Sequence, residues 1–180
     1  MKQKLFTLFL ALVAGAGTLF ASDTQVDGIW YDFDSSTKTA SVTYRGYSVN
    51  SYDDEYSGSV VIPSSVTYNG TTYSVTSIGD AAFVDCSSLT SIFIPDSVRR
   101  IGVRAFLGTG IYNNPSNWDA GALYINDCLL VANDGLLGDY AIKYGTRLIA
   151  NGAFYDCSSL TALNIPLGVT IIGEEAFSGC

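Results

Sequence analysis

Hydrophobic and polar residues alternate in the first third of the chain. The segments 29–33 (Ile-Trp-Tyr-Asp-Phe) and 40–44 (Ala-Ser-Val-Thr-Tyr) both alternate, and a short polar stretch separates them, which predicts a β-hairpin. The segment 66–75 predicts a second hairpin, because Asn69 and Gly70 supply the two positive-φ positions of a tight turn. This part of the chain therefore predicts a small antiparallel β cap.

A different pattern repeats after residue 76. Segment 82–90 returns almost unchanged as segment 153–161, an offset of 71 residues. The pattern Ile-x-x-x-Ala-Phe occurs four times, with steps of 23, 48 and 23 residues between its copies. Identity at fixed spacing indicates a repeat protein, so the repeats have to be settled before any other motif is interpreted. The copies begin at Ile78, Ile101, Ile149 and Ile172.

Each regular repeat has two parts. Leu89, Ile92 and Ile94 place apolar groups on one face of an extended segment. Val98 and Ile101 then begin a run of apolar residues at steps of three and four, which predicts a helical turn. The predicted fold class is an α/β repeat protein, a short solenoid with one strand and one helical turn per 23 or so residues, in which stacked coils bury the core.

The repeat resembles a known family. The pattern Cys-x-x-Leu-x-x-Ile-x-Ile-Pro-x-x-Val-x-x-Ile-Gly-x-x-Ala-Phe is similar to the BspA-like, treponemal-type leucine-rich repeat, closely over 78–106 and 149–180 and loosely over 111–146. The opening at 27–31 also resembles the N-terminal β cap of that family. The resemblance implies an exported protein of host-associated bacteria, displayed at the cell surface, that binds host proteins or other cells and is not an enzyme.

Composition narrows the choice of partner and chemistry. The net charge is −8, which repels phosphate backbones and anionic lipid and so argues against nucleic acid as a partner. The chain has no histidine, which removes Ser-His-Asp and Cys-His nucleophile pairs and imidazole metal sites.

The N-terminus predicts export. Lys2 and Lys4 precede an apolar run at 5–13, and small residues follow it, as in a secretory signal peptide that is cleaved after Ala16 or Ala21. A retained membrane anchor is the alternative, but the run is short for a membrane span. We therefore expect a secreted or cell-surface protein with no membrane insertion after cleavage.

The four cysteines invite a disulfide framework in an exported protein. Cys86, Cys157 and Cys180 each follow the repeat phenylalanine by three residues, and Thr109 takes the same position in another copy. A position that accepts Cys or Thr predicts buried free thiols. A disulfide between Cys157 and Cys180 stays open as an alternative, since stacked coils would bring the two residues into range.

No pair of carboxylates predicts catalysis or a metal. Glu174 and Glu175 are adjacent and would diverge on a turn, whereas glycosidase chemistry needs two facing carboxylates. The sequence 32–36 superficially resembles a calcium loop but lacks the glycine at position 6 and the glutamate at position 12. We expect no enzyme activity, no metal and no cofactor.

The outward strand positions are the candidate binding site. Alignment of the repeats on their last strand isoleucine gives two columns that would line one continuous sheet face. Val61, Phe93 and Tyr124 would form an apolar-aromatic stripe fit to anchor a protein partner. The alternatives are that these side chains pack on one another or that the insertion around Trp118 covers them. The candidate binding residues are Val61, Ser91, Phe93, Tyr124, Asp139, Ala141, Ala162 and Asn164.

The sequence thus predicts three segments: a signal peptide at 1–21, a β cap with the first strand at 22–75, and leucine-rich repeats at 76–180, the last incomplete. The predicted function is non-catalytic adhesion to host or matrix proteins through the sheet face. The alternative is a structural spacer, or a fragment of a longer surface repeat protein, with no binding of its own. Because the last repeat stops at Cys180 without a cap, end-to-end self-association is a further expectation.

Overall fold

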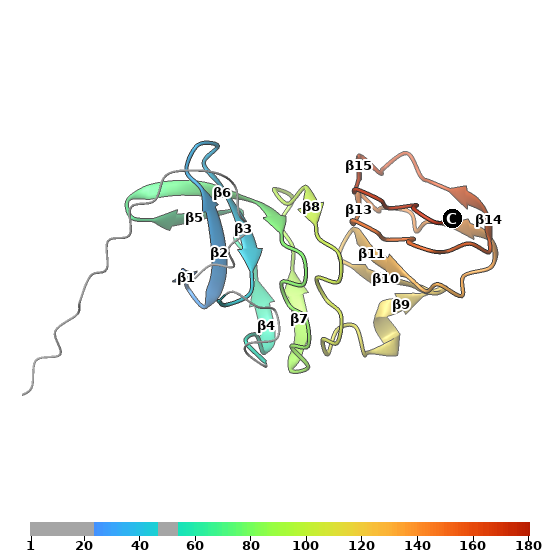
Figure 1. Cartoon of the computed structure of the whole chain (residues 1–180), viewed down its shortest axis with the longest axis horizontal. Coiled ribbons are helices and arrows are strands. Elements are labelled where there is room, and N and C mark those ends of the chain that lie inside the picture. Colours follow the sequence, from blue (N-terminus) through green and yellow to red (C-terminus); the bar gives the residue numbers. More distant parts are fainter. Residues whose placement is uncertain (1–23, 47–53) are drawn as a thin grey trace, which may run out of the picture.

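The computed structural model describes residues 24–46 and 54–180. The predicted signal peptide lies outside these residues, and no helix among them is long and apolar enough to cross a membrane. Strands follow one another along an elongated molecule, from the N-terminal sheet to the last repeat (Figure 1). The elements are β1 (Gln25–Val26), β2 (Ile29–Asp34), β3 (Thr39–Thr43), β4 (Gly58–Val61), β5 (Ser65–Tyr68), β6 (Thr71–Ile78), β7 (Leu89–Phe93), β8 (Arg100–Ile101), the 3-10 helix η1 (Pro115–Asn117), β9 (Trp118–Asp119), β10 (Ala122–Ile125), β11 (Cys128–Ala132), β12 (Gly138–Ala141), β13 (Leu148–Ile149), β14 (Leu160–Asn164) and β15 (Ile171–Ile172).

Both predicted hairpins are confirmed in the N-terminal sheet. Strands β2 and β3 pair antiparallel, and so do β5 and β6. Asn69 and Gly70 connect the second hairpin with φ angles of 49° and 75°, the left-handed conformation that the turn requires. The sheet order is β1-β2-β3-β6-β5, and β8 of the first repeat pairs parallel with β6, so the cap continues into the repeats.

The long strands of the repeats pair parallel in two separate two-stranded sheets. Strand β4 pairs with β7, and β12 pairs with β14. The two sheets are equivalent in detail, because each begins at a left-handed glycine, Gly58 or Gly138, and has a register shift after it. The expected single continuous face is therefore divided in two.

The prediction of an α/β fold with helical turns is wrong. Among the described residues the only helix is η1, and the turn that carries each repeat phenylalanine is non-helical. Two residues per turn adopt a left-handed conformation that an α-helix cannot contain. They occupy the same positions in every copy of the repeat, at Ala81 and Asp85, Arg104 and Gly108, Gly152 and Asp156, and Glu175 and Gly179.

The turns are instead held by hydrogen bonds from one coil to the next. The amides of Ala81, Phe83 and Asp85 donate to carbonyls of the following coil, those of residues 103, 105 and 107. The amides of residues 152, 154 and 156 repeat this arrangement with residues 174, 176 and 178. Apolar residues at steps of three and four predicted a helix. In the structure, alternate turn amides donate to the next coil instead, and the same apolar residues still point into the core.

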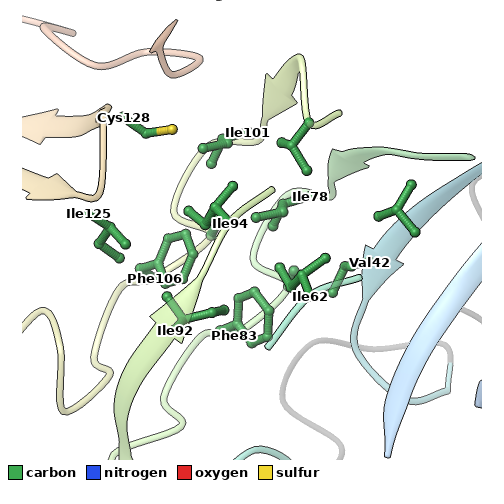
Figure 2. Packing of buried hydrophobic residues seen from close by; sticks show 14 of the residues in the cluster. Val42, Ile62, Ile78, Phe83, Ile92, Ile94, Ile101, Phe106, Ile125 and Cys128 are labelled. Atoms are coloured by element: carbon green, nitrogen blue, oxygen red, sulfur yellow. The ribbon is translucent and has the colours of Figure 1, made fainter. Parts of the chain in front are cut away.

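The repeat phenylalanines stack along the interior. The rings of Phe83 and Phe106 lie 5.1 Å apart and nearly parallel, and those of Phe154 and Phe177 lie 5.5 Å apart in the same way. Figure 2 shows the first pair among the strand isoleucines that surround it. Tyr56 joins this stack to the cap, because its ring meets Phe83 edge-on at 4.7 Å. Each buried side chain of this kind contributes roughly 1.5–3 kcal/mol of transfer free energy.

We call residues 78–108 and 149–180 the two regular coil pairs, because each contains two stacked copies of the repeat turn. The segment between them, residues 109–148, which we call the junction, has a different structure. Strands β10 and β11 form an antiparallel hairpin there, in the sheet order β15-β13-β11-β10-β9. Strand β10 thus pairs antiparallel with its neighbour, whereas β12, later in the junction, pairs parallel with β14 as the regular repeat strands do. The buried core divides at the same place into two clusters, one around Phe83 and Phe106 and one around Phe154.

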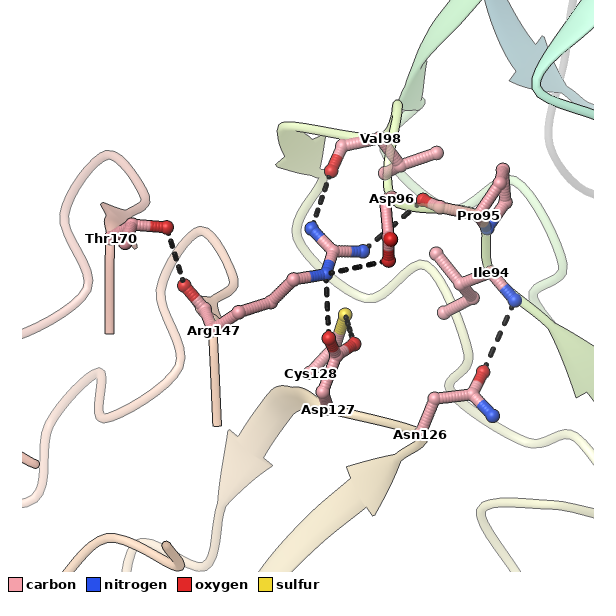
Figure 3. Close-up of polar contacts among 9 residues, drawn as sticks. All are labelled: Ile94, Pro95, Asp96, Val98, Asn126, Asp127, Cys128, Arg147 and Thr170. Atoms are coloured by element: carbon pink, nitrogen blue, oxygen red, sulfur yellow. Dashed lines mark hydrogen bonds and ion pairs between the residues drawn. The ribbon is translucent and has the colours of Figure 1, made fainter. Parts of the chain in front are cut away.

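Arg147 ties the junction to the first coil pair (Figure 3). Its guanidinium donates to the carbonyls of Val98 at 2.8 Å and Pro95 at 3.2 Å. Its Nε lies 2.8 Å from an Asp127 carboxylate oxygen and 3.7 Å from one of Asp96. The planar donor fork of arginine suits several acceptors at once, so one side chain joins three segments of the chain.

Candidate protein-binding surface

The outer face of β4 and β7 carries the strongest exposed apolar pair at the predicted positions. Val61 is opposite Phe93 in the parallel register, and Ser59 is opposite Ser91. The exposed fractions are 66% for Val61 and 52% for Phe93, so neither mutual packing nor the insertion around Trp118 covers them. Trp118 instead meets the ring of Tyr112 edge-on and donates its indole N–H to the Tyr112 carbonyl.

The equivalent face of β12 and β14 presents small and polar groups. Ala141 is opposite Asn164, and Asp139 is opposite Ala162, all four exposed. Asp139 accepts a hydrogen bond from the Thr161 hydroxyl at 2.9 Å. The structure thus brings these four predicted residues together, but on a sheet separate from the one that carries Ser91 and Phe93.

Tyr124 does not continue the stripe. It belongs to β10 of the antiparallel sheet, and only 9% of its surface is exposed. Its hydroxyl lies 2.9 Å from that of Tyr140, and the amide of Lys143 donates to it. The alignment placed Tyr124 beside Phe93 because it treated every strand as part of one parallel sheet, and the β10–β11 hairpin breaks that assumption.

The cysteine thiols are free. Cys86, Cys128 and Cys157 are buried and Cys180 is exposed. Thr109 fills the equivalent position as predicted, fully buried with its hydroxyl donating to the Phe106 carbonyl. Burial raises the pKa of the Cys86 and Cys157 thiols and raises that of Cys128 to about 12. Reactive cysteines require the opposite shift, so these thiols pack as neutral groups.

The carboxylates serve local structure. Asp34 accepts hydrogen bonds from the amides of Ser36 and Thr37, which together with the Ser36 hydroxyl lower its pKa to about 2. Glu174 and Glu175 are exposed on the last turn. Within residues 24–46 and 54–180, no three Asp, Glu or Cys side chains gather in a way that could hold a metal ion.

Sequence reasoning missed two organising residues. Tyr56 lies in the polar segment between the two hairpins, yet it is buried, and its hydroxyl donates to the Thr43 carbonyl and accepts from the Trp30 amide. Arg147 lies in the loosely matched region, where no repeat spacing marks it. The sequence does not distinguish Tyr56 from Tyr47 and Tyr52 of the same segment.

Similarity to solved structures is spread over most of the chain. A leucine rich cell surface protein from Faecalibacterium prausnitzii is 21% identical with a TM-score of 0.38, and the match covers 92% of this chain and 48% of that one. A leucine-rich repeat protein from Bacteroides ovatus is 27% identical with a TM-score of 0.42, covering 88% and 45%. The Treponema pallidum leucine rich repeat protein is 22% identical with a TM-score of 0.42, covering 88% and 68%.

This chain spans about half the length of the first two of these proteins. No curated protein matches it. The sequence model of the BspA type leucine rich repeat region matches residues 59–119 and 132–180, in six copies. These ranges cover more than half of the chain, and the gap between them falls in the junction. The chain therefore belongs to the BspA-type leucine-rich-repeat family.

Proposed function

We propose that this chain is an exported, non-catalytic binding module that attaches to a host or matrix protein through the outer face of β4 and β7. Leucine-rich-repeat families are generally non-catalytic folds that bind other proteins. A similar protein from Faecalibacterium prausnitzii is described as a cell surface protein, which supports display at the surface. The basic and apolar N-terminal sequence supports export.

The observation that carries the proposal is the difference between two equivalent sheets. The β4–β7 and β12–β14 pairs have the same parallel register, the same initial glycine and equivalent end hydrogen bonds, Ile62 N to Phe93 O at 3.1 Å and Ile142 N to Asn164 O at 3.0 Å. The fold therefore accepts Asn164 where the first sheet exposes Phe93. The exposed Phe93 ring is therefore not needed for the pairing of the two strands.

An exposed aromatic beside an exposed aliphatic residue suits a protein partner. Aromatic side chains are enriched among the residues that dominate binding energy, and a polar rim commonly surrounds them. Here Ser59, Ser91 and Thr90 supply polar groups around Val61 and Phe93, all on the exposed side. The Thr90 hydroxyl donates to the Gly58 carbonyl at 3.0 Å and can still accept, while the seryl hydroxyls can hydrogen-bond a partner without the desolvation cost of a charge.

The equivalent sheets also define the test. The double variant Val61→Ala, Phe93→Asn gives the first sheet the residues of the second and should leave folding intact. The purified chain is measured against a panel of extracellular matrix proteins and against host cells. We expect the variant to lose at least about tenfold in affinity, the loss typical of removing one dominant interface residue.

The matched control is Ala141→Ser, Asn164→Ser on the second sheet, which should keep the affinity of the parent chain. Binding that survives in the Val61→Ala, Phe93→Asn variant would overturn the assignment of this face. A chain that binds none of the matrix proteins and no host cell would favour the spacer role instead.

A further inference from the structure

A second surface, on the turn side of the repeats, has the features of a peptide-binding groove. A cavity of about 440 Å³ lies where the stack of phenylalanines is interrupted between Phe106 and Phe154. One wall is the turn 103–107, the other is formed by Asn151, Gly152 and Tyr155, and Leu123 and Leu130 also line it. Its volume falls within the range of ordinary ligand pockets.

The first wall presents unbonded backbone donors. In both regular coil pairs, three alternate turn amides donate to the next coil. The equivalent amides in this wall are those of Arg104, Phe106 and Gly108, and none of them donates to any residue that the structure describes. Phe106 is buried, Gly108 is half-buried and Arg104 is exposed. A buried amide without an acceptor is costly, so a group such as the Phe106 amide is normally satisfied in a folded protein.

The opposite wall presents a carbonyl acceptor. The Ala153 carbonyl accepts from the Ala132 amide at 2.6 Å, but the equivalent carbonyls of Asn151 and Tyr155 accept from no described residue. The two walls touch at one end, where the Asn151 amide donates to the Ile101 carbonyl at 3.0 Å. Beyond this bond the turns separate, so the groove is closed at one end and open towards Phe106 and Tyr155.

We propose that this groove binds an extended peptide segment of a partner protein, which occupies the place of a missing turn between the two regular coil pairs. A peptide in the conformation of the repeat turn offers carbonyls along one edge and amides along the other, as the turns of the regular coil pairs do. The segment accepts hydrogen bonds from Phe106 and Arg104 and donates to Tyr155. This is recognition by addition of a strand, at a turn instead of a sheet edge.

The side chains of the groove define the chemistry of the segment. Phe106, Leu123 and Leu130 give the cavity an apolar lining, so an aromatic or large aliphatic residue of the segment fills it. Arg104 is exposed at the rim and forms no ion pair among the described residues. Glu175 also lines the cavity, so the groove presents one charge of each sign, and an acidic residue of the segment is expected on the Arg104 side.

The turn of the regular repeat provides the probe. A synthetic peptide with the sequence of residues 80–85, Asp-Ala-Ala-Phe-Val-Asp, has an aromatic residue near its centre and an aspartate at each end. Backbone amide resonances of the ¹⁵N-labelled chain are followed during titration. We expect saturable shifts at Arg104, Phe106 and Tyr155, and an affinity at least about tenfold weaker for the peptide with Phe replaced by Ser.

Two variants separate this groove from the rest of the surface. Leu107→Trp places a bulky ring in the groove and should abolish the shifts, whereas the matched control Leu137→Trp, at an exposed residue outside the cavity, should not. The Val61→Ala, Phe93→Asn variant should bind the peptide unchanged. The proposal is overturned if the peptide gives no saturable shift up to about 1 mM, or if the shifts persist in Leu107→Trp.

Discussion

The two regular coil pairs, residues 78–108 and 149–180, and the junction between them use the same repeat in different ways. In each regular pair, three alternate turn amides bond to the next coil and two phenylalanine rings stack at 5.1 or 5.5 Å. At the junction the ring stack stops, the equivalent amides find no described acceptor, and a cavity opens. The antiparallel β10–β11 hairpin pairs with β13 there and reaches the turn with one hydrogen bond, from the Ala132 amide to the Ala153 carbonyl, so the other turn groups stay without a described partner.

The difference teaches where function can reside in a repeat protein. In a regular coil the turn amides and the phenylalanine ring all contact the next coil, so only the outward strand side chains are free to vary. An irregular coil leaves backbone groups and apolar volume available as well. The exposed pair Val61 and Phe93 belongs to the first kind of site, and the groove beside Phe106 belongs to the second.

Removal of a stacked phenylalanine should cause the largest loss in the free energy of unfolding, and the loss should depend on how deeply the ring is buried. Phe83→Ala removes a fully buried ring that contacts both Tyr56 and Phe106, and we expect a loss of about 3–5 kcal/mol in the free energy of unfolding. Phe177→Ala removes a half-buried ring with one stacked partner and should cost clearly less. Urea unfolding followed by circular dichroism measures both, and equal losses would show that the stack is not the main source of stability.

Arg147 should be the most sensitive polar residue of the junction. Arg147→Met removes two hydrogen bonds to backbone carbonyls and leaves Asp127 without its 2.8 Å partner, so we expect a loss of about 3 kcal/mol. The matched control is Arg100→Met, which breaks an exposed ion pair with Asp80 and should cost less than about 1 kcal/mol. The same unfolding measurement compares them, and a cost for Arg147→Met no greater than that of Arg100→Met would contradict its role as a clamp.

Substitution of the glycine in the Ile-Gly motif should lower the free energy of unfolding in a regular coil but not in the junction, by less than the two changes above. A Cβ at Gly102 would lie 2.4 Å from the Asp80 amide nitrogen, so Gly102→Ala forces the two backbones apart at a cost of about 1–3 kcal/mol. The control Gly135→Ala meets its nearest atom at 3.4 Å and should be almost neutral. In the coil that follows the junction, the equivalent position is already Ala150. A neutral Gly102→Ala would indicate that the regular coils are packed as loosely as the junction.

Much of the fold could be predicted from spacing alone. The 23-residue period, both hairpins and the burial of Cys86, Thr109 and Cys157 follow from the sequence, because each depends on a local pattern. Burial was also predicted for Cys180 and is wrong there, since Cys180 is exposed. The helical turn could not be predicted correctly, because apolar residues at Val98, Ile101 and Ala105 fit a helix and a left-handed turn equally well. The left-handed residues that decide between them include Ala81 and Arg104, which have no intrinsic preference for that conformation.

The candidate site was predicted in part for a related reason. The pairs Val61 with Phe93 and Ala141 with Asn164 came from aligning neighbouring repeats, and neighbouring strands do pair in that register. Tyr124 failed because its place depends on a hairpin that no repeat spacing encodes. The groove was not foreseen either, since it results from a turn that is missing rather than from a residue that is present.

Native-state hydrogen exchange at the repeat phenylalanines tests the central contrast most directly. The amides of Phe83 and Phe154 donate to the next coil at 2.8 and 2.7 Å, whereas the Phe106 amide has no acceptor among the described residues. Protection follows the free energy needed to open each hydrogen bond. We predict slow exchange at Phe83 and Phe154 and exchange at Phe106 faster by at least about a hundredfold, a difference in opening free energy near 2.7 kcal/mol. Equal protection at all three amides would contradict the account.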